Sequence, residues 1–218
     1  IAKDELKKEM KSDPAKAAET LEKKADELDK KEKELDKRED ALKDANADKS
    51  VYAAKFFYLK IREYLENGHY NNELFMINPA TRKVEFKSPV TNICGSRYDV
   101  FSDGIVIITH KGVHTEGHRL TLVDRETLAA KIDGTDNIFW RSFIEIRDGF
   151  IYAIIYDNGT YYLGRFDAGL KLVAKSGEKI NENTFITFYD KYVYINSADR
   201  KILVLKKEDL SLADTIQP

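Results

Sequence analysis

Three histidines spaced four residues apart, His110, His114 and His118, have the type and spacing that could bind a metal ion, and Glu116 lies between the last two. On a helix this spacing would align three imidazoles on one face and form a credible zinc site. However, the segment HKGVHTEGH contains two glycines and links two expected strands, so a helix is not expected there. The sequence favours a solvated hairpin, with a metal site as the alternative. No metal ligand and no cofactor are assigned.

Cys94 is the only cysteine of the chain. It excludes an intrachain disulfide and a metal cluster built from cysteines. Nothing in the sequence identifies the orienting His–Asx pair that a nucleophilic cysteine needs, so we expect a buried, inert thiol. The chain contains no glycine-rich phosphate loop, no G-x-S-x-G elbow and no H-E-x-x-H motif. The sequence therefore predicts that the protein is not an enzyme.

The predicted binding site consists of Phe139, Trp140 and Arg141, together with Arg97 at a nearby linker position. These residues place the only tryptophan and two guanidinium groups among the long loops. An aromatic anchor beside an arginine fork is typical of the residues that dominate protein interfaces. The alternative is that Trp140 only fills a gap between two structural units.

One block of sequence recurs three times in a single register, ending at Asp103, Asp148 and Asp190. The period is 45 and then 42 residues, which indicates a repeat architecture. The recurring positions are Ile93, Ile138 and Ile180 ten residues before each aspartate, Lys83, Leu128 and Leu170 twenty before, and the aromatic residues Tyr98, Phe143 and Phe185.

Each repeat can be parsed as four short strands, because two-residue alternation is interrupted by turn signals such as Asp157-Asn158-Gly159. Four such units predict a mainly β fold, a four-bladed β-propeller-like domain, with a β-sandwich or an open meander as the alternative. Strand direction reverses at each turn, so the long loops share one face, where binding is expected. Those loops are 65–72, 90–97, 110–118, 134–142 and 177–184. The expected strands are 49–53, 56–64, 73–77 and 83–86; 98–101, 105–109, 119–123 and 128–131; 143–147, 150–156, 161–166 and 170–173; and 185–188, 192–195, 201–205 and 211–215.

Composition changes near residue 48, because most earlier residues are charged and every aromatic residue comes later. We therefore expect a charged helical segment over 1–47 and a β-repeat domain over 48–218. Within the first segment, Asp13-Pro14 marks the start of the helix. The leucines recur every seven residues, as at the d positions of a coiled coil, and the matching a positions end in two glutamates. Charged a positions weaken pairing, so the pattern favours a lone or weakly paired helix over a parallel dimer. The leucines are Leu21, Leu28, Leu35 and Leu42, and the a positions are Ala18, Ala25, Glu32 and Glu39.

The net charge of −2 gives no electrostatic case for a nucleic-acid partner. No apolar run approaches the roughly 20 residues that cross a bilayer as a helix. The sequence thus leaves a protein partner as the expected one.

The stretches NNELFMINPATRKVEF and YYLGRFDAGLKLVAKSGEKI, following a Lys/Glu-rich helix, resemble the C-terminal portion of the spirochaetal 83/100 kDa antigen family. The resemblance implies a periplasmic or envelope-associated protein without established catalytic activity, and it carries no motif of functional residues. The predicted function is a non-enzymatic protein-binding module of the bacterial cell envelope that binds through the long-loop face. The alternatives are a coil that mediates self-association or tethering, and a propeller that binds a small molecule or a metal.

Overall fold

A computed structural model describes residues 22–31, 33, 55–101 and 103–218. The chain divides into two units, Ile1–Lys55 and Phe56–Pro218. In the first unit, residues 22–31 and 33 are helical and exposed, and Leu28 keeps 66% of its surface in solvent. The remainder of the predicted helix, with its Asp13-Pro14 start and most heptad positions, lies outside the described residues. Among the described residues, no helix is long and apolar enough to span a membrane.

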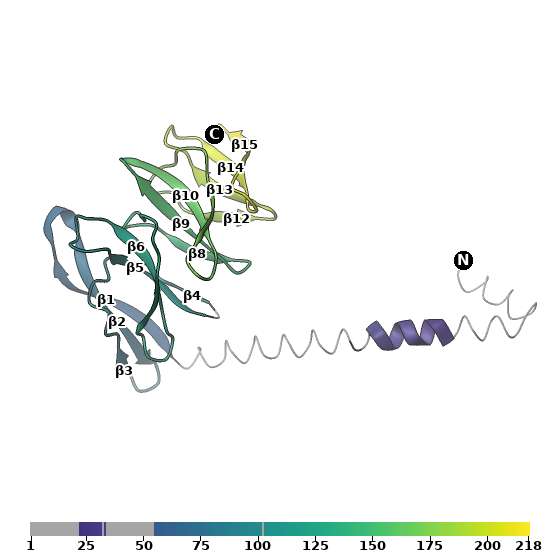
Figure 1. Cartoon of the computed structure of the whole chain (residues 1–218), viewed down its shortest axis with the longest axis horizontal. Helices are drawn as coiled ribbons and strands as arrows, with labels where there is room; N and C mark the ends of the chain where they lie inside the picture. The colour runs from purple at the N-terminus through teal and green to yellow at the C-terminus, as the bar shows by residue number, and fades with distance from the viewer. Residues whose placement is uncertain (1–21, 32, 34–54, 102) are drawn as a thin grey trace, which may run out of the picture. The chain divides into compact units, whose positions relative to one another are not determined.

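The second unit consists of four antiparallel meanders that follow one another along the chain, as the colour gradient of Figure 1 shows. Each meander forms its own hydrogen-bonded sheet, which confirms the four-bladed β-propeller-like fold rather than a sandwich. The first blade shows three strands, because the predicted strand 49–53 lies outside the described residues. Blade 1 is β1 (Phe56–Tyr64), β2 (Tyr70–Asn78) and β3 (Lys83–Lys87); blade 2 is β4 (Asp99–Phe101), β5 (Gly104–His110), β6 (His118–Val123) and β7 (Ala130–Asp133). Blade 3 is β8 (Ile144–Arg147), β9 (Phe150–Asp157), β10 (Thr160–Phe166) and β11 (Leu172–Lys175); blade 4 is β12 (Thr187–Tyr189), β13 (Tyr192–Asn196), β14 (Ile202–Lys206) and β15 (Leu212–Ile216).

The isoleucines that recur in the sequence connect the blades. Each forms an isolated β-bridge to the second strand of its own blade or to the residue just after that strand, and each is at least 98% buried. The repeat register read from the sequence therefore corresponds to equivalent structural positions. The bridges are Ile93 with Thr109, Ile138 with Ile155, and Ile180 with Ser197.

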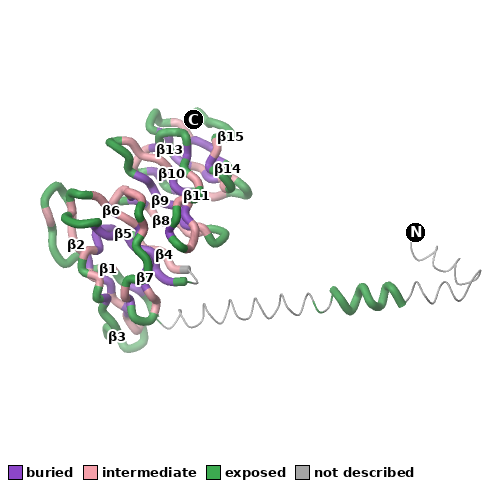
Figure 2. Tube along the Cα trace, viewed as in Figure 1, coloured by how far each residue is buried: buried purple, intermediate pink, exposed green. Residues whose placement is uncertain are grey.

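The core lies between neighbouring blades. One cluster joins blades 2 and 3, with Leu122 and Ile151 among its members, and another joins blades 3 and 4, with Leu163 and Val193 among its members. Every residue of β5 is buried, and Figure 2 shows the buried residues concentrated in such middle strands. The continuous apolar run of β5 follows from burial of both its faces.

The outer strands begin later than the sequence predicts. Leu128, Leu170 and Leu210 close the turns before β7, β11 and β15 with positive φ angles of 52°, 62° and 59°. A left-handed backbone is unfavourable for a bulky residue unless the surroundings compensate. Each leucine side chain is at least 98% buried, so packing stabilises the turn. The predicted strand starts at Leu128 and Leu170 were wrong by two residues because these leucines are turn residues with core side chains.

Candidate functional site

The hairpin of β5 and β6 carries the two most deeply buried histidines. His110 and His118 are the last cross-strand pair of its ladder, and their ring centroids lie 5.1 Å apart. Only 3% of His110 and 8% of His118 is exposed, so the expectation of a solvated hairpin was wrong for both residues. The predicted strands ended at Thr109 and began again at Arg119, so they left His110 and His118 in the loop, each one residue outside the observed ladder.

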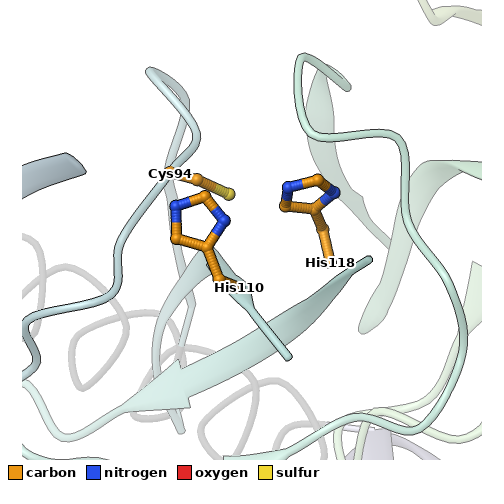
Figure 3. A group of neighbouring side chains, drawn as sticks. All are labelled: Cys94, His110 and His118. Carbon is orange, nitrogen blue, oxygen red and sulfur yellow. The ribbon is translucent and has the colours of Figure 1, made fainter. Parts of the chain in front are cut away.

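Cys94 lies against this histidine pair. Its backbone N–H donates to the carbonyl of Ile108 at 3.0 Å, which fixes the linker on β5. The side chain is fully buried, as predicted, and burial raises the pKa of the thiol. One potential ligand atom from each of Cys94, His110 and His118 lies within 4.8 Å of the others. Figure 3 shows the sulfur directed toward the two imidazole rings.

The other two histidines of the chain join the same group. His69 follows the short 3-10 turn η1 (Glu66–Gly68), and its ring stacks on His118 at 5.4 Å between centroids. His114, in the loop between β5 and β6, lies 5.3 Å from the His69 ring. All four histidines and the single cysteine thus converge from three loop or linker segments. We call Cys94, His69, His110, His114 and His118 the histidine cluster.

Burial and mutual repulsion favour the neutral form of His69, His110 and His118. Burial, followed by the nearby His69, lowers the pKa of His110 to about 4. Burial, followed by the nearby His110, lowers the pKa of His118 to about 3. The pKa of His69 is also lowered, chiefly by burial. A neutral imidazole keeps one nitrogen lone pair, which is the form that coordinates a metal.

The hydrogen bonds of the cluster leave several of its nitrogens without a partner. His110 Nε2 lies 3.0 Å from Asn71 Oδ1, an acceptor, so Nε2 carries the proton and Nδ1 carries the lone pair. Asn71 in turn donates from Nδ2 to Glu63 at 2.8 Å, which fixes its amide orientation. Within the described part of the chain, His110 Nδ1, His118 Nε2 and His114 Nε2 are buried and have no hydrogen-bond partner.

A cavity of about 350 Å³ opens above the cluster. Trp140 stacks on His69 with ring centroids 4.5 Å apart, and the guanidinium of Arg141 lies 4.3 Å above the Trp140 ring. Phe139 contacts both Trp140 and Tyr161 edge to face. The residues lining the cavity are His69, His114, Thr115, Glu116, Gly117, His118, Asn137, Ile138, Phe139, Trp140, Tyr156 and Tyr161.

The structure therefore brings together three of the four predicted binding residues and joins them to the histidine cluster. Phe139 and Trp140 line the cavity and Arg141 lies on the Trp140 ring, whereas the guanidinium of Arg97 lies 4.3 Å above the Phe143 ring. The sequence analysis missed the meeting of Cys94 with the histidines. The signal was present, since segments 65–72, 90–97 and 110–118 were all expected on one face and together hold every histidine and the cysteine.

A second cavity, of about 420 Å³, lies beside blades 3 and 4. Three of its charged side chains already have partners, because Lys207 pairs with Asp148 at 2.6 Å and Arg165 donates to the carbonyl of Glu208 at 2.8 Å. It also lacks histidine and cysteine. The chemistry of the described residues therefore favours the cavity above the histidine cluster.

No protein-family profile and no curated protein matches this chain. Among solved structures, the computationally designed Ika8 protein is 11% identical with a TM-score of 0.50, over 72% of this chain and 47% of that chain. The WD40 β-propeller domain of Doa1 is 10% identical with a TM-score of 0.46, over 73% and 56%. BamB from Moraxella catarrhalis is 12% identical with a TM-score of 0.40, over 70% and 59%. The chain spans about half the length of these proteins, and the likeness concerns the fold alone.

Proposed function

We propose that the β domain is a non-enzymatic protein-binding module that takes an exposed segment of a partner protein into the cavity beside Trp140. The observation that carries this proposal is the contact of Trp140 with both His69 and the guanidinium of Arg141, at the wall of a cavity on the loop face. Partly buried aromatic and arginine side chains are the usual centres of binding energy in protein interfaces.

A binding role fits the cysteine better than a catalytic role. A nucleophilic cysteine requires a lowered pKa and access to substrate. Cys94 has a raised pKa and no exposed surface. The resemblance to the spirochaetal antigen family supports the further proposal that this module works in the periplasm or cell envelope.

The rival is that the charged helix binds the partner or a second copy. Its described residues are all exposed, so Leu28 offers a test of the helix that leaves the β domain unchanged. The two surfaces are distinguishable because they lie in different compact units.

Trp140→Ala is expected to weaken partner binding by more than about 10-fold, because truncating a central aromatic anchor typically costs about 2 kcal/mol. The measurement is a crosslinking capture from a spirochaete envelope lysate, followed by titration of the recovered partner with each variant. Tyr64→Ala is the matched control, since Tyr64 is an aromatic residue, 78% exposed, that does not line the cavity. Full affinity in Trp140→Ala, or its loss in Leu28→Lys, would contradict the proposal.

A further inference from the structure

We propose that Cys94, His110 and His118 bind a Zn²⁺ ion at the floor of the cavity. The fourth position faces the cavity, where His114 or a water molecule completes the coordination. This inference is independent of the proposed protein binding, because it rests on the donor atoms beneath the aromatic wall and not on the wall itself.

The donor set selects the metal. One sulfur and two imidazole nitrogens are soft to intermediate ligands, which suit Zn²⁺ and other late transition metals and do not suit Mg²⁺ or Ca²⁺. Tetrahedral zinc holds such ligands at about 2.0–2.3 Å, which places neighbouring ligand atoms about 3.5 Å apart. The three ligand atoms already lie within 4.8 Å of one another, so small side-chain rotations close the site.

The unpartnered nitrogens point to the same conclusion. His110 Nδ1 and His118 Nε2 are buried without a partner, on side chains that are 97% and 92% buried. A buried polar atom without a hydrogen bond is costly, and native structures contain few of them. A bound cation would satisfy both lone pairs at once.

The hydrogen bonds made by the proposed ligand histidines are of the kind found around metal sites. A ligating histidine normally donates its other ring N–H to an oxygen acceptor, which fixes the tautomer and aims the lone pair at the ion. His110 does so toward Asn71 Oδ1, and Asn71 is held in turn by Glu63. On His118, Nε2 has no hydrogen-bond partner among the described residues, which leaves it available to an ion.

The experiment titrates the chelator-treated 218-residue chain with Zn²⁺ by calorimetry and with Co²⁺ by absorption spectroscopy. We expect one equivalent of either metal, and a thiolate-to-cobalt charge-transfer band together with the intense visible bands of tetrahedral cobalt. The cobalt spectrum is read on the unmutated protein, so it tests the site even where a variant folds poorly. Absence of zinc binding, or a cobalt spectrum without the charge-transfer band, would overturn the proposal.

Variants assign the ligands. Cys94→Ser and His118→Gln are each expected to weaken zinc binding by more than about 100-fold, and Asn71→Ala by about 10-fold through the loss of outer-shell orientation. His69→Gln is the matched control, because His69 stacks on His118 and is absent from the ligand group. Unchanged affinity in Cys94→Ser and His118→Gln would refute the site.

A different observation carries a second inference, which concerns the two ends of the blade series. On blade 1, Phe57 points into the core, and the neighbouring side chains of the strand point the other way and form an apolar outer face. On blade 4, Val193 points into the core, and its neighbours form a second apolar outer face. Blade 3 packs against a neighbour on both faces, and β5 of blade 2 is buried throughout. The blade 1 face holds Phe56, Tyr58, Phe75, Ile77 and Val84, and the blade 4 face holds Tyr189, Tyr192, Tyr194, Ile202 and Ile216.

We infer that a second copy of this chain covers these faces and closes a ring of eight blades. Four blades correspond to 47% of the designed chain of similar fold, so two copies supply a full set. The blade 4 face of one copy would pack on the blade 1 face of the other, twice, around a two-fold axis. Figure 1 shows blades 1 and 4 at opposite ends of the series, as this arrangement requires.

Sedimentation equilibrium of the full chain is expected to give twice the 25.1 kDa monomer mass. Tyr58→Glu on blade 1 and Tyr194→Glu on blade 4 should each shift the equilibrium to monomer by at least 10-fold. Leu28→Lys should leave the dimer intact, which separates blade contacts from helix pairing. A monomer at high micromolar concentration, or a dimer that only Leu28→Lys dissociates, would overturn the inference.

Discussion

Replacing Gly104 with alanine is expected to lower the free energy of unfolding by about 3 kcal/mol, the upper part of the range for overpacking a core. A β-carbon at Gly104 would lie 2.3 Å from the carbonyl oxygen of Val123 and 2.8 Å from a methyl carbon of Leu122. The backbone oxygen belongs to the paired strand β6 and cannot rotate away. The residue also has φ of +156°, which side chains rarely adopt.

Gly149→Ala is the matched control, because the sequence repeat places Gly149 at the position equivalent to Gly104. Nothing lies within 4 Å of a β-carbon there, so only the positive φ of +76° opposes the change. We expect a loss of about 1 kcal/mol at Gly149. Urea unfolding of both variants provides the measurement, and equal losses would contradict the packing argument.

The two glycines differ because the hairpins differ by one residue. In blade 2, Phe101 pairs with Gly104, so Gly104 already belongs to the ladder. In blade 3, Arg147 pairs with Phe150, which leaves Asp148 and Gly149 as a two-residue turn with both φ angles positive. Blade 4 follows blade 3, with Asp190 in the turn. The sequence repeat treats Asp103, Asp148 and Asp190 as equivalent. The structure shows that the turn in blade 2 lies one residue earlier in the repeat than the turns in blades 3 and 4.

The sequence was sufficient for features that depend on local pattern. Alternation and turn residues located the strands, and each recurring isoleucine proved to form a β-bridge from the linker before a blade to the second strand of that blade or to the residue just after it. The loops expected on one face do meet, as the stacking of His69 on Trp140 shows. These features succeed because each is encoded within a few neighbouring residues.

The features that the sequence missed depend on contacts between distant segments. The left-handed Leu170 is a turn residue only because its side chain packs into the core. The histidine cluster requires a linker, a hairpin and the loop after η1 to approach one another, and no spacing within one segment reports that. Spacing along the chain suggested His110, His114 and His118 as a group, whereas the three ligand atoms that converge belong to Cys94, His110 and His118.

Acidification of the metal-free chain is expected to destabilise the fold before most carboxylates titrate. In the unfolded chain both histidines bind a proton below about pH 6.5. In the folded chain His110 binds its proton only near pH 4 and His118 only near pH 3, because their pKa values are lowered. The stability that these two histidines provide is therefore complete above pH 6.5 and is lost as the pH falls. His110 alone accounts for about 3 kcal/mol by pH 4.

The groups around the pair reinforce this direction, because His69 and His114 face it and both add positive charge when protonated. Burial raises the pKa values of Asp99 and Glu145, so these two carboxyls oppose the trend. Both are present in the unmutated chain and in His118→Gln, so comparing urea unfolding of the two proteins between pH 7.5 and 4.5 isolates the contribution of His118. In His118→Gln the loss per pH unit should become smaller by up to about 1.4 kcal/mol, one proton's worth. A slope unchanged in that variant would mean that His118 takes up its proton equally readily in the folded and the unfolded chain, which would contradict its lowered pKa.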